Sequence, residues 1–153
     1  MADIASRPPH PAKTLQRAFY ELTKPGIAGY VMVTAGVSAF VASRGQLAVS
    51  TALHVMAATG LATAGALALN QYVERELDAV MVRTRYRPLP AGRVAPMTAF
   101  IFGSSLLMAG VIYMALALGA LPALLTILSA AAYHGVYTPL KTRTSLATLA
   151  GGV

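Results

Sequence analysis

The sequence predicts an all-α membrane protein, a polytopic bundle of transmembrane helices. Hydrophobic residues make up 56% of its 153 residues and charged residues only 11%, with a mean hydropathy of +0.62. This leaves too little polar surface for a soluble globule of this size. The charges are also clustered, because nineteen, twenty-nine and forty-seven uncharged residues follow Lys24, Arg44 and Arg93 respectively. About twenty apolar residues cross a bilayer as a helix, so we expect this chain to lie in a lipid bilayer.

Four complete spans and a truncated fifth are predicted. They occupy residues 26–43, 47–69, 97–118, 120–137 and 145–153. Pro96 and Pro122 suit the first turns of the third and fourth spans, where the missing N–H of proline does no harm. The last apolar run has nine residues, too few to cross a bilayer. The second span is expected to continue as a helix beyond the membrane to about Arg85, before the prolines of RPLPAG at 87–92 end it.

The basic residues predict which side of the membrane each segment faces. Eleven of the twelve Lys and Arg residues lie before the first span, between the second and third, or after the fourth, and only Arg44 lies on the other side. Cytoplasmic segments carry the excess of basic residues, so residues 1–24 are expected to be a polar cytoplasmic segment. The bacterial inner (plasma) membrane is the favoured location, with the mitochondrial inner membrane as the alternative. Topology and anionic lipid then explain the net charge of +7, and no nucleic-acid partner is expected.

A dense group of charges follows the second span, with eight of them in the twenty residues from Glu74 to Arg93. On a helix, Asn70, Glu74 and Asp78 drift only about 40° per step and lie on one stripe about 6 Å apart. Mg²⁺ prefers oxygen ligands, commonly one or two carboxylates together with water and substrate phosphate. The arginines that follow can bind phosphate through forked, charge-assisted bonds. The pattern therefore predicts a magnesium-dependent diphosphate site, in which Glu76, about 120 to 140° away, is a weaker candidate.

A simpler interpretation of the same residues stays open. The acidic side chains can be solvated charges at a helix end, paired with Arg75 and Arg83.

The stripe also continues into the membrane as small residues. These are Ala66, Ala62 and Ala58. Their size leaves room for a bound molecule, or it allows close packing against a neighbouring helix through residues such as Gly60, Ala64 and Ala68.

Three segments resemble one family of membrane enzymes. They are LTKP at 22–25, NQYVERELDAVMVRTRYRPLPAGRV at 70–94 and YTPLKTRT at 137–144. The middle segment resembles the first acidic motif of the UbiA-type intramembrane prenyltransferases. Within that family, its RTRYRPLPAGR tail and the YTPLKTRT segment are most similar to the protohaem IX farnesyltransferases, or haem O synthases. The spacing of Asn and acidic residues alone is a weak signal, but the agreement of all three segments and the topology makes it fairly strong.

The resemblance implies a magnesium-dependent reaction that transfers a farnesyl group from farnesyl diphosphate to a vinyl group of protohaem IX. Haem is then a substrate and not a cofactor. The resemblance gives Asn70, Glu74 and Asp78 to the metal as catalytic residues. It gives the diphosphate five cations, which are Lys24, Arg83, Arg87, Lys141 and Arg143.

The chain departs from the family pattern in two residues and in length. Glu74 stands where the family more often has Asp, and Gly26 stands where Arg often follows Lys-Pro. Family members have about nine spans and a second acidic motif. The resemblance therefore implies that residues 25–153 form the N-terminal part of such a domain, and we expect no turnover from these residues alone.

Two other functions are compatible with the sequence. The rivals are an aromatic prenyltransferase of quinone biosynthesis, which would use the same metal site, and a non-catalytic transporter or assembly subunit.

His54 and His134 are the ionisable residues inside the predicted spans, where such groups are functional by default. An offset of roughly 10 Å along the helices argues against a haem held by both. We expect both to be neutral and hydrogen-bonded, with His134 near enough to the motif side to contact a substrate.

Overall fold

The computed structural model describes residues 14–138, except for the side chains of residues 136 and 137. The elements in chain order are α1 (Leu15–Leu22), α2 (Pro25–Ala42), α3 (Val49–Val73), α4 (Arg75–Val80), α5 (Pro96–Leu118), α6 (Ala120–Ala132) and the π-helix η2 (Tyr133–Tyr137). Every regular element in the described part of the chain is a helix, so the all-α class is confirmed. The predicted fifth span at 145–153 lies outside the described residues.

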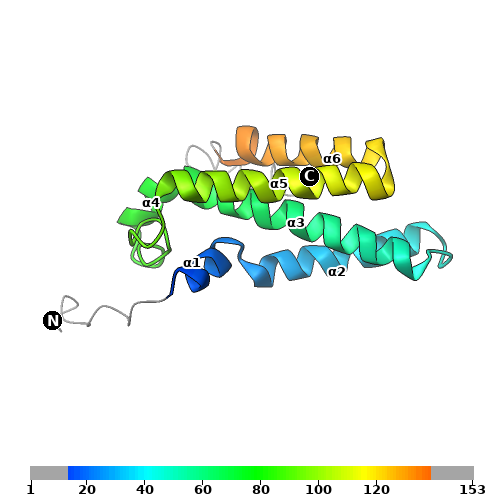
Figure 1. Cartoon of the computed structure of the whole chain (residues 1–153), viewed down its shortest axis with the longest axis horizontal. Helices are drawn as coiled ribbons and strands as arrows, with labels where there is room; N and C mark the ends of the chain where they lie inside the picture. The colour runs from blue at the N-terminus through cyan, green and yellow to red at the C-terminus, as the bar shows by residue number, and fades with distance from the viewer. Residues whose placement is uncertain (1–13, 139–153) are drawn as a thin grey trace.

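Four helices run side by side along the long axis of the molecule, and each is antiparallel to the one before it (Figure 1). α3 packs on α2 and α5, and α6 packs on α5. By length and composition, α2, α3 and α5 can cross a membrane. The shorter α6 and η2 together cover residues 120–137, the range of the fourth predicted span. The number of segments that cross the membrane stays a prediction.

α3 and α5 touch through their backbones. A Cβ atom added to Gly65 would lie 2.7 Å from the carbonyl oxygen of Gly103 and closer still to the amide nitrogen of Leu107. A Cβ atom added to Gly110 would lie 2.8 Å from the Cα atom of Ala62. Lipid tails are as apolar as leucine, so association of membrane helices depends on close van der Waals packing, which small residues permit. These glycines therefore fix the distance between the two helices.

The stripe of small residues on α3 is filled by its neighbours. Ala58 is fully buried against α5 and α6, and Ala62 lies against Gly110. On the α2 side, a Cβ atom on Gly60 would lie 2.6 Å from the Sδ atom of Met32. The close-packing interpretation is therefore confirmed for Gly60, and also for Ala68, whose Cβ atom would lie 3.2 Å from a Cβ atom added to Gly103. The structure leaves no room for a bound molecule at Ala58 and Ala62.

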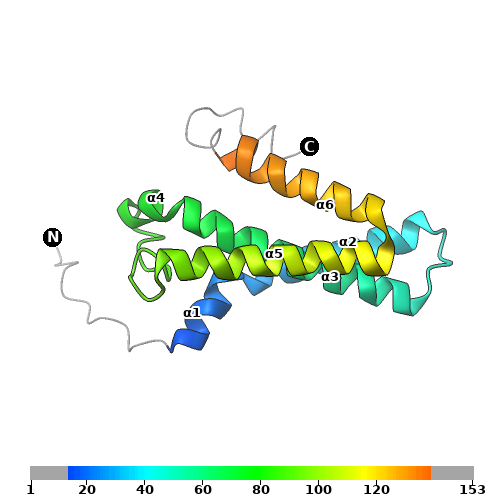
Figure 2. The same ribbon diagram turned by 45° about the horizontal axis from the view of Figure 1, so that its top comes forward.

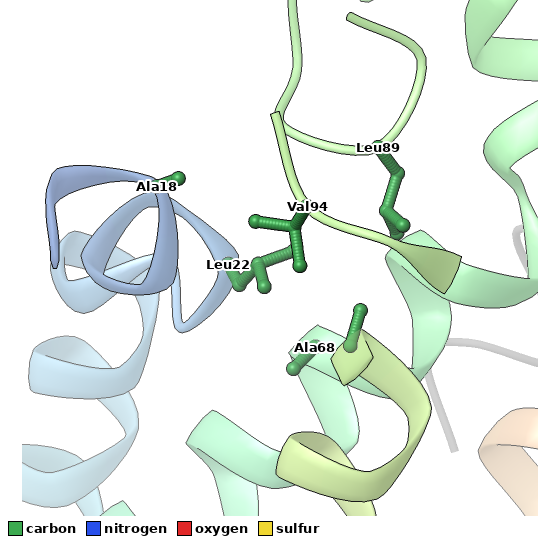
Figure 3. Close-up of a cluster of buried hydrophobic side chains, with 6 residues drawn as sticks. Ala18, Leu22, Ala68, Leu89 and Val94 are labelled. Carbon is green, nitrogen blue, oxygen red and sulfur yellow. The ribbon is translucent and has the colours of Figure 1, made fainter. Parts of the chain in front are cut away.

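α1 lies within the segment for which only a polar chain is predicted. Its Ala18 and Leu22, four residues apart on one face, are both completely buried. They belong to a cluster with Ala68 of α3, Ala99 of α5, and Leu89 and Val94 of the connection between α4 and α5 (Figure 3). The rings of Phe19 and Phe102 meet edge to face, with centroids 4.8 Å apart. This cluster fastens α1 to one end of the bundle.

The second predicted helix ends earlier than expected, and the prediction that it reaches about Arg85 is wrong. α3 ends at Val73, Glu74 has φ −83° and ψ 1°, and α4 continues only to Val80. The amide of Asp78 still donates to the carbonyl of Glu74 at 2.8 Å, so the helical hydrogen bonding bridges the interruption. Beyond Val80, the hydroxyl of Thr84 donates to the carbonyl of Asp78 at 3.0 Å. Such side-chain bonds to the backbone compete with helix continuation.

The sides of the bundle are apolar and the charges lie at its ends. On α2 the exposed large side chains are Ile27, Tyr30, Val31, Val33, Val37, Phe40 and Val41. Among the described residues, Arg44 alone carries a charge in the turn between α2 and α3, where it and Gly45 adopt positive φ. The other described cations lie on α1, on α4 or in the connections at the opposite end. This separation agrees with the predicted topology, whose orientation stays a prediction.

Replacing Gly65 or Gly110 with alanine should destabilise the bundle, because each new methyl group would meet backbone atoms that cannot rotate away. Overpacking of this kind costs about 1 to 3 kcal/mol. Gly29 of α2 is the matched control, since a Cβ atom there has no neighbour within 4 Å. Its replacement should be neutral or stabilising, because alanine favours helices by up to about 1 kcal/mol over glycine. Unfolding of the detergent-solubilised chain, followed by circular dichroism, measures all three. Equal stability of the three variants would contradict the backbone contact.

Candidate functional site

The polar residues of the acidic motif gather at one end of the bundle. There the end of α3, the short α4 and the connection to α5 lie near α1 (Figures 1 and 2). Asn70, Glu74 and Asp78 are only 3%, 8% and 3% exposed. A buried carboxylate must be paired or hydrogen-bonded to stay ionised. The hypothesis that Glu74 and Asp78 are solvated helix-end charges is therefore wrong, and their partners define the site.

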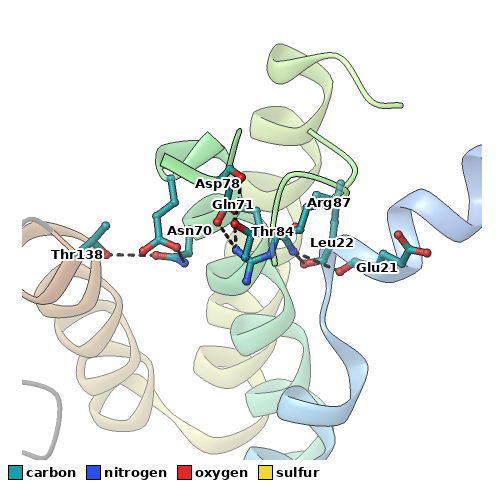
Figure 4. Close-up of polar contacts among 9 residues, drawn as sticks. Glu21, Leu22, Asn70, Gln71, Asp78, Thr84, Arg87 and Thr138 are labelled. Atoms are coloured by element: carbon teal, nitrogen blue, oxygen red, sulfur yellow. Dashed lines mark hydrogen bonds and ion pairs between the residues drawn. The ribbon is translucent and has the colours of Figure 1, made fainter. Parts of the chain in front are cut away.

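Asn70 and Glu74 form one side of this site. The amide Nδ2 of Asn70 donates to the Oε2 of Glu74 at 3.0 Å, which confirms that the two residues are neighbours on the stripe. The Oδ1 of Asn70 accepts a hydrogen bond from the hydroxyl of Thr138 at 3.3 Å (Figure 4). Thr138 follows η2 directly, at the end of the fourth predicted span. The contact therefore joins residues 68 positions apart in the chain.

Asp78 forms the other side, in an ion pair with Arg87. The Nη1 of Arg87 donates to both carboxylate oxygens of Asp78, at 2.8 and 2.6 Å. The side chain of Asp78 is 5% exposed and that of Arg87 is 25% exposed. Removal of one partner of a buried pair leaves an uncompensated charge, which costs several kcal/mol. This pair holds the irregular connection after α4 against the acidic motif.

Arg75, which the simpler interpretation pairs with the acidic side chains, forms an ion pair at the surface. Arg75 pairs with Glu76 at 2.9 Å, and the Glu76 side chain is 83% exposed. Glu76 thus behaves as the solvated charge of the simpler interpretation, which agrees with its rank as the weaker ligand candidate.

A cavity of about 290 Å³ lies next to the ion pair. Its lining residues are Glu21, Lys24, Gln71, Arg83, Tyr86, Arg87 and Pro88. Lys24, Arg83 and Arg87 come from two separate segments and are three of the five cations that the resemblance gives to a diphosphate. The structure brings them to one cavity, while Lys141 and Arg143 lie outside the described residues. Glu21 is the one carboxylate among the described lining residues, so the excess of positive charge around this space favours an anionic ligand.

The end of α1 forms one wall of this cavity, and the side chains of Gln71 and Arg93 bind it to the rest of the site. The Nε2 of Gln71 donates to the carbonyls of Leu22 and Glu21, at 2.9 and 3.3 Å. The Nη2 of Arg93 donates to the Oε2 of Glu21 at 2.5 Å and to the carbonyl of Tyr86 at 3.0 Å. Sequence reasoning missed Gln71, Glu21 and Thr138. The signal for two of them was present, because Gln71 lies inside the acidic motif and Thr138 inside the YTPLKTRT segment.

The donor set fits a divalent cation that prefers oxygen. Asn70 supplies an amide oxygen, and Glu74 and Asp78 supply carboxylates, and all three residues are buried. Within residues 14–138, no group of three or more His, Cys, Asp or Glu residues is placed to hold a metal. Two carboxylates and one amide match the habit of Mg²⁺, which uses few carboxylates and fills its other positions with water and phosphate oxygens. Each carboxylate of Asp78 and Glu74 keeps lone pairs beyond its present bonds.

The two histidines of the predicted spans differ. The Nδ1 of His54 lies 2.7 Å from the hydroxyl of Tyr113, which confirms the expected hydrogen bond. The Nε2 of His134 is buried and has no hydrogen-bond partner within the described part of the chain, so the expectation is not met at that nitrogen.

Comparison with known proteins finds one family that matches most of the chain. Residues 31–153 match the model of the UbiA prenyltransferase family. Protoheme IX farnesyltransferase of Aquifex aeolicus is 39% identical over 138 residues, which are 90% of this chain and 47% of that protein. The protein of the same name from Myxococcus xanthus is 45% identical over 142 residues, or 92% of this chain and 47% of that protein. That of Anaeromyxobacter dehalogenans is 40% identical over 132 residues, 86% of this chain and 44% of that protein.

The chain spans about half the length of these curated relatives. No solved structure matches it. The family match covers well over half of the chain and includes the acidic motif, α4 and the arginines that follow. With its apolar helices, the match identifies a multi-pass membrane protein, and the chain belongs to the UbiA prenyltransferase family.

Proposed function

We propose that this chain takes part in transferring the farnesyl group of farnesyl diphosphate to a vinyl group of protohaem IX, which gives haem O. The relatives named protoheme IX farnesyltransferase support the choice of reaction. One structural observation carries the proposal, namely that Lys24, Arg83 and Arg87 line one cavity and that Arg87 also pairs with the buried Asp78. We propose that residues 25–153 form the N-terminal part of the prenyltransferase domain and bind the diphosphate but do not complete the reaction alone.

The residues of the site suit the first step of such a transfer. Mg²⁺, held by Asn70, Glu74 and Asp78, would act as a Lewis acid on the diphosphate oxygens. When the bond between the allylic carbon and the diphosphate oxygen breaks, the electron pair leaves with the diphosphate. Fixed cations around the cavity stabilise the negative charge that develops on this leaving group. The vinyl group of haem, a substrate here, then attacks the allylic cation, which leaves a cation on the vinyl carbon next to the ring. Water adds to that carbon and loses a proton, which completes the hydroxyethylfarnesyl side chain.

Arg87 has two roles in this proposal, as the partner of Asp78 and as a contact of the diphosphate. Its guanidinium carries five N–H donors, and only Nη1 is used in the bonds to Asp78. The remaining donors belong to a side chain that lines the cavity. One residue therefore links the metal ligand Asp78 to the anion-binding wall. Lys141 and Arg143 remain proposed diphosphate contacts from the segment after the fourth span.

We also propose a cytoplasmic N-terminus, with four crossing segments and a fifth that begins near residue 145. The side-by-side helices and the one-sided cations support this arrangement. We place the protein in the bacterial inner membrane, with the mitochondrial inner membrane as the alternative.

Farnesyl diphosphate should bind the chain in lipid nanodiscs in the presence of Mg²⁺, and calorimetry measures the affinity. Alanine at Asn70, Glu74 or Asp78 should weaken this binding by a factor of ten or more, about 1.4 kcal/mol. Each substitution removes an oxygen ligand or a link to Arg87. Glu76→Ala is the matched control, because that carboxylate is exposed and paired with Arg75. Its affinity should be unchanged.

Undiminished binding after all three alanine replacements would contradict the proposed site. Binding that does not need Mg²⁺ would favour the transporter or assembly subunit. Binding of haem is measured by the change in its absorption spectrum. Magnesium-dependent binding of the diphosphate together with no binding of haem would favour an aromatic prenyltransferase.

Arg87→Met should both weaken diphosphate binding and destabilise the protein, because Asp78 would keep its buried charge without a partner. The expected loss of stability is about 3 kcal/mol, the lower end for a broken buried pair, since Arg87 is partly exposed. The double variant Arg87→Met, Asp78→Asn should recover part of the stability but none of the affinity. Thermal unfolding and calorimetry separate the two effects. Equal stability of the single variant and the wild type would contradict the structural role of the pair.

The natural absence of cysteine permits a direct test of orientation. We expect Glu76→Cys to react with a membrane-impermeant maleimide from the cytoplasmic side. Gln46→Cys, in the turn at the opposite end of the bundle, should react from the other side. Both native side chains are exposed, so accessibility within the protein is matched. Labelling of both positions from one side would contradict the proposed topology.

A further inference from the structure

We propose that Gln71 is a positioning residue for diphosphate binding, which sets Lys24 at the cavity by holding the last turn of α1. The inference rests on the proposed function, in which Lys24 contacts the diphosphate. The comparisons assign no role to Gln71, and its place inside the acidic motif does not make it a metal ligand. Adjacent helix positions point about 100° apart, so Gln71 faces away from the stripe of Asn70.

The contact of Gln71 with α1 is buried and specific. Gln71 is 1% exposed, and its amide nitrogen donates to the carbonyls of both Leu22 and Glu21. These carbonyls belong to the last turn of a helix, where the regular pattern of intrahelical bonds ends, and that of Glu21 also accepts the amide of Lys24 at 3.4 Å. Figure 4 shows Gln71 directed at Leu22 and Glu21, on the side of α3 away from Thr138. One amide thus ties the end of α1 to the helix that carries the acidic motif.

The residue that follows this turn has an unusual backbone. Lys24 has φ 43° and ψ 62°, the left-handed conformation that residues with a Cβ atom rarely adopt. It also precedes Pro25, a position that normally favours extended backbone. Its carbonyl accepts the amides of Ile27 and Ala28 and so begins α2. Such strain persists only where the surrounding structure fixes both sides, and it is frequent at functional sites.

A second contact fixes the same turn to the arginine-bearing wall. Arg93 bonds the carboxylate of Glu21 and the carbonyl of Tyr86, which lies between Arg83 and Arg87 along the chain. Lys24, Arg83 and Arg87 share the lining of the cavity with Glu21, and Arg87 also pairs with Asp78. The placement of the cations therefore depends on these charges and on anchors elsewhere in the backbone. Gln71 anchors the segment of Lys24, and Arg93 joins that segment to the arginines. The relative position of the three cations follows from these anchors.

A purely structural role for Gln71 would be to donate hydrogen bonds to the carbonyls at the end of α1. The two roles differ in one measurable respect. A structural role lowers stability and affects ligand binding equally whether or not Lys24 carries a charge. A positioning role lowers the affinity for diphosphate only when Lys24 is present.

A double-mutant cycle on the whole chain in nanodiscs tests this difference, with farnesyl diphosphate and Mg²⁺ as the probe. Gln71→Met keeps the length of the side chain but removes the donor, and Lys24→Met removes the charge. Each single variant should lose about tenfold in affinity. The double variant should bind within about twofold of Lys24→Met alone, because interacting residues are not additive. Gln46→Met, an exposed glutamine in the turn between α2 and α3, is the matched control and should bind like the wild type.

Two results would overturn the inference. One is unchanged affinity in Gln71→Met, and the other is a double variant in which the two losses multiply. If Gln71→Met does not fold, as judged by its helical circular dichroism, Gln71→Asn replaces it in the cycle. Asparagine keeps the amide but is one methylene shorter. The double variant with Lys24→Met should again bind within about twofold of Lys24→Met alone.

The same titrations separate this inference from the proposed function. If the wild type does not bind farnesyl diphosphate, or if Glu74→Ala binds as well as the wild type, the proposed function fails and the role of Gln71 fails with it. If Glu74→Ala loses binding but the cycle is additive, only the role of Gln71 is refuted.

Discussion

The backbone contact between α3 and α5 is the constraint on which the rest of this structure depends. Gly65 and Gly110 let the two helices approach until backbone atoms touch, with Gly103 on the facing surface. In a bilayer, association cannot rely on expelling water, so such close packing supplies much of the attraction. The contact fixes the position of the end of α3 relative to the start of α5. Both the acidic motif and the arginine-bearing connection start from these two points.

The end of α3 then serves two neighbours at once. Asn70 meets Thr138 at the end of the fourth predicted span, and Gln71 meets the carbonyls of α1. Adjacent residues on a helix point in different directions, so one turn of α3 links segments that are remote in sequence. Asp78, one helical turn beyond Glu74, brings in the connection to α5 through Arg87. The site is therefore a junction of three segments around the end of α3.

Much of the architecture followed from the sequence, whereas the site followed only in part. The first three predicted spans agree with α2, α3 and α5, because uncharged stretches of this length have few alternatives in a membrane. The stripe of Asn70 and Glu74 was predictable from helical spacing alone. The early end of the helix at Val80 was not, since it involves a bond between Thr84 and the backbone of Asp78. The short α1 was also missed, because its buried face contains only Ala18 and Leu22.

By itself, the sequence determined the helical class, the apolar helices, the end of the bundle at which the cations gather, and the family motif. These properties depend on composition and on spacing along one helix, both of which are local. Only the tertiary structure decided that α5 fills the small-residue stripe at Ala62, that Asp78 pairs with Arg87 and that Gln71 holds α1. These contacts join segments far apart in the chain, and their partners depend on how closely the helices pack. Helix packing is set by many weak contacts acting together, which no single segment of sequence contains.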